Sequence, residues 1–483
     1  MSQEKVQPVL VLTVISLAAF LAIVDGTVVA LTLPAIGRDL GADIVGLAWV
    51  PNAYVVTYTA LLATAGSLGD RFGRRLIFLV GIALFAAGSV ACATAESLSW
   101  LILGRVVQGA GGSAMLTLAL AHISVAFPER REWAMGIYVM FGSLGGVLGP
   151  LVGGAVTQFG NWRLMFWILA VIALLSLRLA WSTVTDSRGN HRRLDMVGLL
   201  LLGATVLSVN LVLLNGAGWG WLSAPTLATA GIGLGAAGVL FRWEARNSAP
   251  ILDLRQFAHR DFLANTLASA AAWFAIFAVD VYTSMYLQRV LGFGAVTVGL
   301  ALAAAGLTGA LAGFTVGRAS ASIGRDRLLA ASMITMSLLL IPWIVVSAWW
   351  PLWSMVLLLG ALGPPLTYIL ALSAAGAMGG LPAEQAGSGA ATFNTVRQFG
   401  SSIGVALPAV VLASAAGAAT IEVSFSALQG AFAAAFLVRA GAFALASAVV
   451  TLMLLWPRSA AAAARIPLVA GSIPRHMNEE DVP

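Results

Sequence analysis

The sequence carries little charge. Only 10% of its 483 residues are Asp, Glu, Lys or Arg, whereas hydrophobic residues make up 60%. Soluble globular domains contain about 25% charged residues, so this composition excludes an ordinary soluble domain. The mean hydropathy of +0.93 indicates instead a protein that crosses a membrane several times.

Residue types that perform chemistry are also scarce. Lys5 is the only lysine, so the lysine-containing phosphate loop of ATPases is excluded, and the single cysteine, Cys92, excludes an intrachain disulfide. No metalloprotease helix or nucleophile elbow is present, and the four histidines are too scattered for a metal motif: His122, His191, His259 and His476. We therefore predict that the protein is not an enzyme and holds no metal or cofactor.

Long apolar runs dominate what is present. They lie at 9–34, 45–67, 76–95, 100–122, 133–158, 163–184, 195–215, 225–243, 262–288, 296–317, 327–347, 351–375, 387–414 and 430–456. A helix needs about 20 apolar residues to span a bilayer, so we predict fourteen transmembrane helices. The first run is too long for a signal peptide and lacks a small-residue cleavage site, so we count it as a span.

The arginines predict the orientation. An even number of spans places both termini on one side, and Arg71, Arg74, Arg75 and most other loop arginines fall on that side. Cytoplasmic loops carry the excess of positive charge, so we predict cytoplasmic termini in a multi-pass protein of the cytoplasmic (inner) membrane. The net charge of +6 then reports these loops rather than nucleic-acid binding.

The two halves of the chain share short motifs at similar separations. Phe141-Gly142-Ser143 recurs as Phe399-Gly400-Ser401, Gly66, Gly73 and Arg74 recur as Gly317, Gly324 and Arg325, and Val24-Asp25 recurs as Val279-Asp280. These repeats predict a duplicated six-helix unit, an architecture typical of transporters. We predict an all-α fold of 6 + 2 + 6 helices: a bundle in 1–194, two inserted and peripheral helices in 195–261, a second bundle in 262–456 and a cytoplasmic tail in 457–483.

Two acids lie deep inside apolar runs. Asp25 is about 16 residues into the first run and Asp280 about 18 into the ninth, and both runs start from the same side. At about 1.5 Å per residue the two lie at similar depths. A carboxylate is costly in lipid, so we predict that they face each other across a central cavity, with a structural ion pair to arginine as the alternative.

Aromatic residues and a methionine surround Asp280. They are Phe274, Phe277, Tyr282, Met285 and Tyr286. Such side chains can bind a lipophilic cation, although ordinary packing explains them equally well. We predict that Asp280, Phe277, Tyr282 and Tyr286 contact the substrate.

Two glycine-containing stretches suggest moving or tightly packed helices. The loop 66–75 places an acid among three arginines, either as a latch between the halves or as a topology signal, and we predict a gate of Gly66, Asp70, Arg71, Gly73, Arg74 and Arg75. The stretch 145–154 combines small residues with a helix-bending proline, and we predict close helix packing at Gly145, Gly149, Pro150, Gly153 and Gly154.

These stretches resemble motifs of the major facilitator superfamily. The loop 66–75 resembles its signature, and 145–154 resembles the motif that marks its antiporters. The segment from Asp25-Gly-Thr-Val-Val to Leu33-Pro34 resembles the first-span motif of its fourteen-helix drug:proton antiporters, the quaternary-ammonium and multidrug exporters. The segment 101–109 resembles the fourth-span motif, and further matches are Trp49, Tyr54, Asn161-Trp162-Arg163 and Arg397-Gln398-x-Gly400.

The resemblance implies a major facilitator fold with two pseudo-symmetric six-helix halves and a proton-coupled multidrug efflux antiporter. It implies proton coupling by Asp25 and Arg105, to which we add Asp280 because of its matching depth in the second half. We also predict substrate contacts from Trp49, Tyr54 and Gln108, which lie in or near the matching motifs. The expected partners are protons, small lipophilic and especially cationic compounds, and the lipid bilayer, with the chain acting as a monomer.

Departures from the family pattern leave the cargo open. Ala30 replaces the usual asparagine and Thr32 the usual alanine of the first motif, and Ala321 occupies the repeat position of Asp70. An exporter of one metabolite, antibiotic, siderophore or lipid remains an alternative. A membrane receptor or scaffold that transports nothing is a remote one.

Overall fold

A computed structural model describes residues 8–127, 129–185, 195–247, 250–345, 350–379, 381, 386–416 and 425–456. Lys5, the predicted boundary at residue 194 and the predicted tail 457–483 lie outside these ranges. Within them the chain forms helices and no β-strand.

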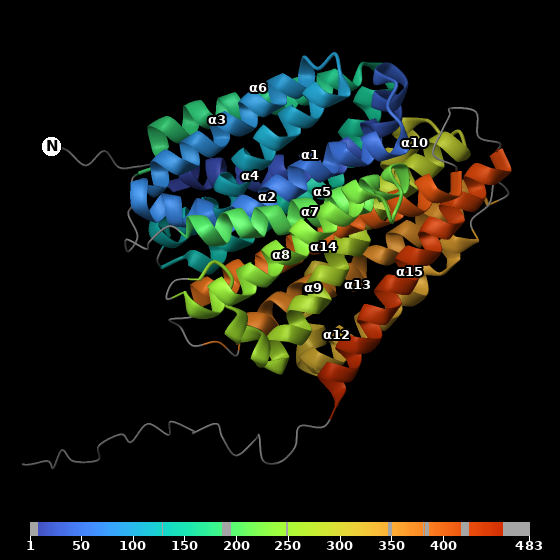
Figure 1. Cartoon of the computed structure of the whole chain (residues 1–483). Helices are drawn as coiled ribbons and strands as arrows, with labels where there is room; N and C mark the ends of the chain where they lie inside the picture. Colours follow the sequence, from blue (N-terminus) through green and yellow to red (C-terminus); the bar gives the residue numbers. More distant parts are fainter. Residues whose placement is uncertain are drawn as a thin grey trace, which may run out of the picture.

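Long helices lie side by side in one elongated bundle (Figure 1). The helices of the first half and the insertion are α1 (Pro8–Leu40), α2 (Ile44–Phe72), α3 (Arg74–Ala93), α4 (Leu98–Ala126), α5 (Arg131–Phe159), α6 (Trp162–Thr183), α7 (Met196–Trp219) and α8 (Ala224–Arg246). Those that follow are η1 (Leu254–Ala258), α9 (Arg260–Ala278), η2 (Val279–Thr283), η3 (Tyr286–Val290), α10 (Ala295–Gly313), α11 (Val316–Ile323), α12 (Arg325–Leu340), η4 (Pro342–Ile344), α13 (Leu352–Gly379), α14 (Ala386–Ala416) and α15 (Phe425–Leu455). Among the described residues, 14 helices are long and apolar enough to cross a membrane, which confirms the predicted count.

The repeated glycines form the same turn in both halves. Gly73 has a φ of 105° and Gly324 a φ of 90°. Side-chain-bearing residues rarely adopt such angles, so glycine is needed there. Gly73 joins α2 to α3 and Gly324 joins α11 to α12. The repeated motif therefore forms the same kind of turn between two helices in each half.

The two halves contact each other mainly where α5 packs against α10 and α2 against α14. A Cβ on Gly154 would lie 2.5 Å from the carbonyl oxygen of Ala295, and one on Gly306 would lie 2.9 Å from that of Gly146. Only glycine permits so close an approach. The small residues of α5 therefore form a tight seam with α10, while Gly145, Gly149 and Gly153 face α1.

Towards the other end of the bundle α5 and α10 separate. A Cβ placed on Gly136, Gly142 or Gly313 would have no atom of another described segment within 4 Å. The side chains of Val139 and Phe314 are 57% and 83% exposed. Because helices alternate in direction, this open end is the one that carries the Gly73 turn, and the seam closes the opposite end.

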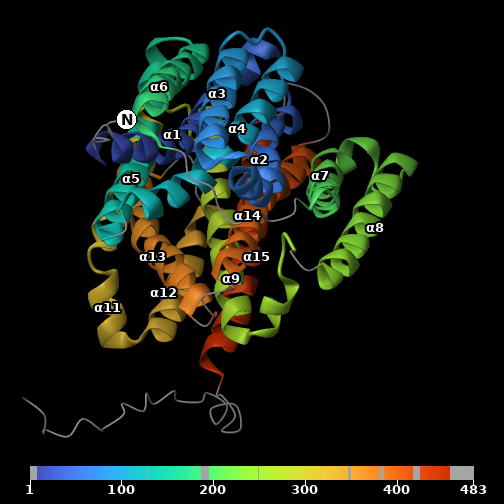
Figure 2. The same ribbon diagram turned by 90° about the vertical axis from the view of Figure 1, so that its left-hand side faces the viewer.

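The two inserted helices differ in their packing. α7 packs against α2 and α14, while α8 packs on α7 and lies outermost (Figure 2). Asn52 of α2 donates to Asn210 Oδ1 of α7 at 2.7 Å, and the hydroxyl of Ser402 on α14 lies 2.8 Å from the same oxygen. All three side chains are fully buried. The expectation that both inserted helices are peripheral is thus wrong for α7, which ties the two halves together.

Replacing Asn210 with leucine should lower thermal stability by about 1–3 kcal/mol, because it leaves the buried polar groups of Asn52 and Ser402 without their shared acceptor. Thermal unfolding in detergent measures the loss. The control is Asn215→Leu, since Asn215 is on the same helix and, among the described residues, its side chain bonds only to the Leu211 carbonyl of its own turn. Equal melting of the two variants would contradict a bridging role for Asn210.

Candidate functional site

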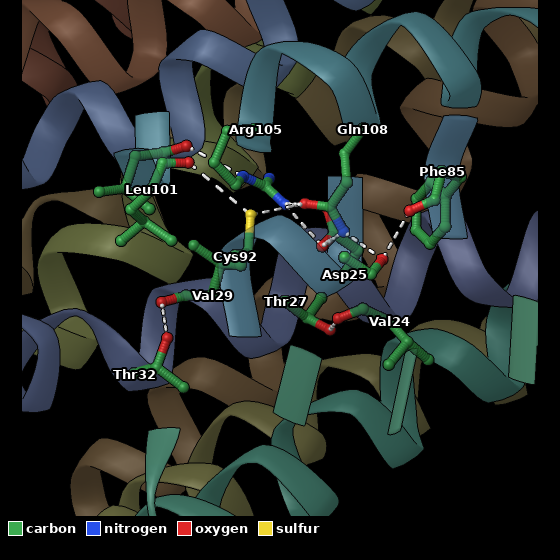
Figure 3. Close-up of polar contacts among 12 residues, drawn as sticks. Val24, Asp25, Thr27, Val29, Thr32, Phe85, Cys92, Leu101, Arg105 and Gln108 are labelled. Atoms are coloured by element: carbon green, nitrogen blue, oxygen red, sulfur yellow. Dashed lines mark hydrogen bonds and ion pairs between the residues drawn. The ribbon is translucent and has the colours of Figure 1, made fainter. Parts of the chain in front are cut away.

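Asp25 lies in a closed polar network between α1 and α4 (Figure 3). Arg105 Nη1 lies 2.6 Å from Asp25 Oδ1 and 2.8 Å from Oδ2, and the side chains of Arg105 and Asp25 are 1% and 0% exposed. Arg105 also donates to the carbonyl of Val50 at 3.1 Å and to Gln108 Oε1 at 2.7 Å. The acid and the base therefore neutralise each other inside the first half of the molecule.

The surrounding side chains complete this network. Gln108 donates to Ser89 Oγ at 2.7 Å, and Cys92 Sγ lies 3.5 Å from Gln108 Oε1. The Tyr54 ring packs on the Arg105 guanidinium, 4.7 Å from its carbon. In this structure Gln108 and Tyr54 hold the ion pair in place, and their contact with substrate stays a prediction.

Small residues bring these helices close enough to build the network. A Cβ on Gly88 would lie 2.6 Å from the backbone nitrogen of Gln108, and one on Gly104 would lie 2.7 Å from Cys92 Sγ. A Cβ on Gly109 would lie 2.5 Å from the carbonyl oxygen of Tyr54. Glycines on α3 and α4 thus set the distance between the helices that carry Ser89, Cys92, Arg105 and Gln108.

A cavity of about 680 Å³ lies between the two halves. Its wall is mostly apolar and includes Ile23, Thr27, Met140, Pro150 and Leu302. Asp280 is the only charged residue among the lining residues, and it forms no hydrogen bond or ion pair with any described residue. The cavity therefore offers one unpaired carboxyl group in apolar surroundings.

Asp25 does not face this cavity. Ile23 and Thr27 of α1 line it, whereas Asp25 points towards α4. Successive residues of an α-helix are rotated by about 100°, which places Asp25 and Thr27 on nearly opposite faces. The prediction that Asp25 and Asp280 face each other is wrong in this structure, and the alternative of an ion pair with arginine applies to Asp25.

Two of the aromatic residues near Asp280 pack inside the second half. Tyr282 donates to the carbonyl of Val405, and Tyr286 packs on Phe432 and Phe436, with both tyrosines 1% exposed. They stabilise the second half and are not among the residues that line the cavity, so their contact with substrate stays a prediction.

Phe277 and Trp49, the remaining aromatic residues predicted to contact substrate, are also not among the residues that line the cavity. Phe277 lies between the halves: its ring stacks on Trp273, with 5.7 Å between centroids, and lies 4.0 Å from a Cβ placed on Gly26. Trp49, near the start of α2, packs against the hydrophobic core.

Among the described residues the predicted gate forms an ion pair between Arg74 and Asp70, and this pair lies within the first half. Arg74 Nε and Nη2 lie 3.0 Å and 2.8 Å from Asp70 Oδ1, and Arg75 donates to the carbonyl of Trp181 at 2.6 Å. In the second half Arg325 pairs with its neighbour Asp326. The interaction of Asp70 seen here is therefore with its own loop, not across the halves.

Asp70→Asn should insert and fold normally yet lower the export rate at least tenfold, because it removes the charge that holds Arg74 against the α2–α3 turn. Initial efflux rates at matched expression measure the effect. The control is Asp326→Asn, whose pair with Arg325 is likewise only partly exposed. Wild-type efflux by the Asp70 variant would refute a gating role and leave the loop as a topology signal.

Comparison with known proteins identifies the family. The model of the Major Facilitator Superfamily matches residues 15–405. The chain belongs to this superfamily. It is therefore a transporter and not an enzyme, as the sequence predicted.

Two relatives and one solved structure illustrate the similarity. The chain is 31% identical over 414 residues to the multidrug resistance protein Stp of Mycobacterium tuberculosis, covering 84% of this chain and 76% of that protein. It is 26% identical over 412 residues to the methylenomycin A resistance protein of Streptomyces coelicolor, covering 83% and 85%. The crystal structure of a bacterial homologue of the human lysosomal transporter Spinster, inward-facing and unoccupied, is also similar. The match covers 93% of the present chain and 98% of the homologue, with a TM-score of 0.67 at 18% identity.

Sequence reasoning missed several residues of these sites. Ser89 and Cys92 lie in an apolar run whose pattern gives no polar signal, and Thr27 was noticed only as part of a motif. Asn52, Asn210 and Ser402 are far apart in the sequence. Their buried position inside predicted spans was the one available signal, since polar side chains there must find partners.

Proposed function

We propose that this transporter exports lipophilic cations across the cytoplasmic membrane in exchange for protons. The observation that carries the proposal is Asp280, an unpaired carboxyl group in the wall of an apolar cavity of about 680 Å³ between the halves. A carboxylate in such surroundings attracts a cation strongly, because little water screens the interaction. The apolar wall favours compounds that also bury hydrophobic surface.

The orientation supports export. If the arginine-rich loops are cytoplasmic, as the positive-inside rule predicts, the open end of the α5–α10 interface faces the cytoplasm and the glycine seam closes the outside. Gln288 of the second half donates to the carbonyl of Leu31 at 3.1 Å, and the Val296 amide donates to Gln158 at 2.9 Å, at the closed end. Export then requires that these contacts break while the open end closes.

The Asp25–Arg105 pair supports proton coupling. Protonation of Asp25 would remove the charge that holds Arg105, and the guanidinium would have to find new partners among Gln108, Val50 and their neighbours. Such a change alters the packing of α1 against α4, and α1 also lines the cavity through Ile23 and Thr27. Proton binding and substrate binding would thus act on the same helix from opposite faces.

A single antibiotic as cargo is the second candidate. The relative from Streptomyces is named for resistance to one compound, whereas the mycobacterial one is named for several. Both names describe resistance, so export of a toxic compound is common to the two candidates.

Ethidium efflux from energised cells, with and without a protonophore, tests the proposal. We expect cells that express the transporter to expel ethidium and to lose this ability when the protonophore collapses the proton gradient. Efflux that is unchanged by the protonophore would refute proton coupling. If a neutral dye but not ethidium is expelled, the cationic specificity is wrong.

A further inference from the structure

Arg397 differs from the other charged residues in the spans. It lies on α14, and its guanidinium carbon is 4.7 Å from the centroid of the Trp273 ring on α9. Its Nε is buried and has no hydrogen-bond partner in the described part of the chain, and no described carboxylate forms an ion pair with it. A guanidinium stays charged in proteins, so this position holds a fixed positive charge inside the molecule without a counter-charge.

The groups around Arg397 come from both halves. Besides Trp273, its electrostatic neighbours are two tyrosines, Tyr58 on α2 and Tyr138 on α5. Trp273 Nε1 is a second buried donor without a partner. The cluster thus combines hydrogen-bond donors with aromatic faces.

The position of this cluster separates it from a merely structural arginine. Arg439 also lacks partners and stacks on Phe436, but it is 1% exposed and lies on α15 inside the second half. Arg397 is only partly buried, and its helix α14 packs against α2 of the first half and α9 of the second. On α9 Trp273 lies three residues before Ile276, and on α5 Tyr138 directly precedes Val139. Ile276 and Val139 both line the Asp280 cavity, so this cluster lies beside that cavity.

We propose that Arg397, with Trp273, forms a binding subsite for the anionic group of an aromatic compound, such as a carboxylate or a phenolate. The inference rests on the proposed function and extends its cargo to anionic and zwitterionic aromatics. The planar guanidinium matches the two oxygens of a carboxylate, the Trp273 N–H supplies a further donor, and the aromatic side chains pack against the ring of the compound. Asp280 and Arg397 then select opposite charges within one transport route.

Binding of two ligands of equal shape and opposite charge tests this proposal. Isothermal titration of the purified full-length protein in detergent would use 1-naphthoate, 1-naphthylmethylammonium and the neutral 1-naphthylmethanol. The variants are Arg397→Gln, Arg397→Lys and Trp273→Phe. The control is Arg178→Gln, which removes an exposed arginine from α6.

We expect Arg397→Gln to weaken naphthoate binding about 10- to 100-fold, the range for a charge-assisted hydrogen bond, and to leave the ammonium ligand within about twofold. Arg397→Lys keeps the charge but loses the planar fork, and Trp273→Phe loses one neutral donor, so each should weaken naphthoate binding about 2- to 10-fold. Arg178→Gln should bind both ligands as the wild type does.

The proposal is overturned if the wild type binds naphthoate no more tightly than naphthylmethanol, or if Arg397→Gln loses all ligands equally, which would make the arginine structural. If Arg397→Gln does not fold, unchanged naphthoate binding by Arg397→Lys and Trp273→Phe would overturn it. Ethidium efflux by the wild type is measured separately. A failure of that efflux refutes the proposed function, whereas a failure of naphthoate binding alone refutes only the anionic subsite.

Discussion

Replacing Asp25 with asparagine should abolish uphill export of every substrate. Asparagine keeps the size and hydrogen bonding of the side chain but cannot ionise, so the proposed proton carrier would have no group that titrates. Proton-driven accumulation in inverted vesicles should fall at least 100-fold, whatever the charge of the substrate. Facilitated movement down a gradient should persist, since the cavity itself is unchanged.

The ion pair allows coupling to be separated from folding. Asp25→Asn leaves the Arg105 charge buried without its partner, and breaking a buried pair in this way typically costs about 3–5 kcal/mol. Arg105→Gln conversely leaves the Asp25 carboxylate buried without its partner. The double variant, Asp25→Asn with Arg105→Gln, contains neither of these two buried charges, so it should melt closer to the wild type than either single variant.

Comparison of the three variants gives the decisive measurement. We expect the double variant to recover stability without recovering uphill transport. If it regains uphill transport, Asp25 serves only as a structural counter-charge. If the single Asp25 variant still concentrates any substrate against its gradient, the proton travels by another group.

Asp280→Asn should have the second largest effect, and it should depend on the charge of the substrate. In the apolar cavity a cation gains most from a nearby carboxylate, so export of a monocation should fall about 10-fold or more, and that of a dication further, because its greater charge interacts more strongly. A neutral dye should be exported at a rate within about twofold of the wild type. Asp25 should not replace Asp280, since it is paired with Arg105 and faces away from the cavity.

Initial rates of export at matched expression, for one dye of each charge, measure this selectivity. Asp261→Asn is a suitable control, since Asp261 lies in the first turn of α9, about 19 residues before Asp280 and far from the cavity lining. Equal loss of all three dyes in the Asp280 variant would show that the residue couples protons or stabilises η2 instead of recognising charge.

Much of the fold is encoded in local patterns. The fourteen spans follow from the lengths of the apolar runs, because a bilayer demands about 20 apolar residues from any helix that crosses it. The matching turns at Gly73 and Gly324 follow from the repeat, because each motif places the required glycine between two helices. Likewise, the close packing of 145–154 follows from small side chains at helical spacing.

The partners of the deep charges depend on the rotation of each helix, which the sequence does not reveal. Depth along a helix comes from counting residues, so the similar depths of Asp25 and Asp280 were predictable. Rotation is set by packing against neighbours, here by glycines of α3 and α4 that bring Arg105 to Asp25. An apolar run gives little periodic signal when most faces of the helix are hydrophobic.

The sequence by itself determined the class of the protein, its fourteen helices, its internal repeat and the rarity of its buried charges, because these depend on composition and on spacing along one chain. Only the tertiary structure decided that Asp25 is paired while Asp280 is not, that Tyr282 and Tyr286 face the core, and that α7 bridges the halves. Each of these results joins helices that are far apart in the sequence. In such cases the distance between side chains is fixed by the packing of whole helices and not by any local preference of the residues.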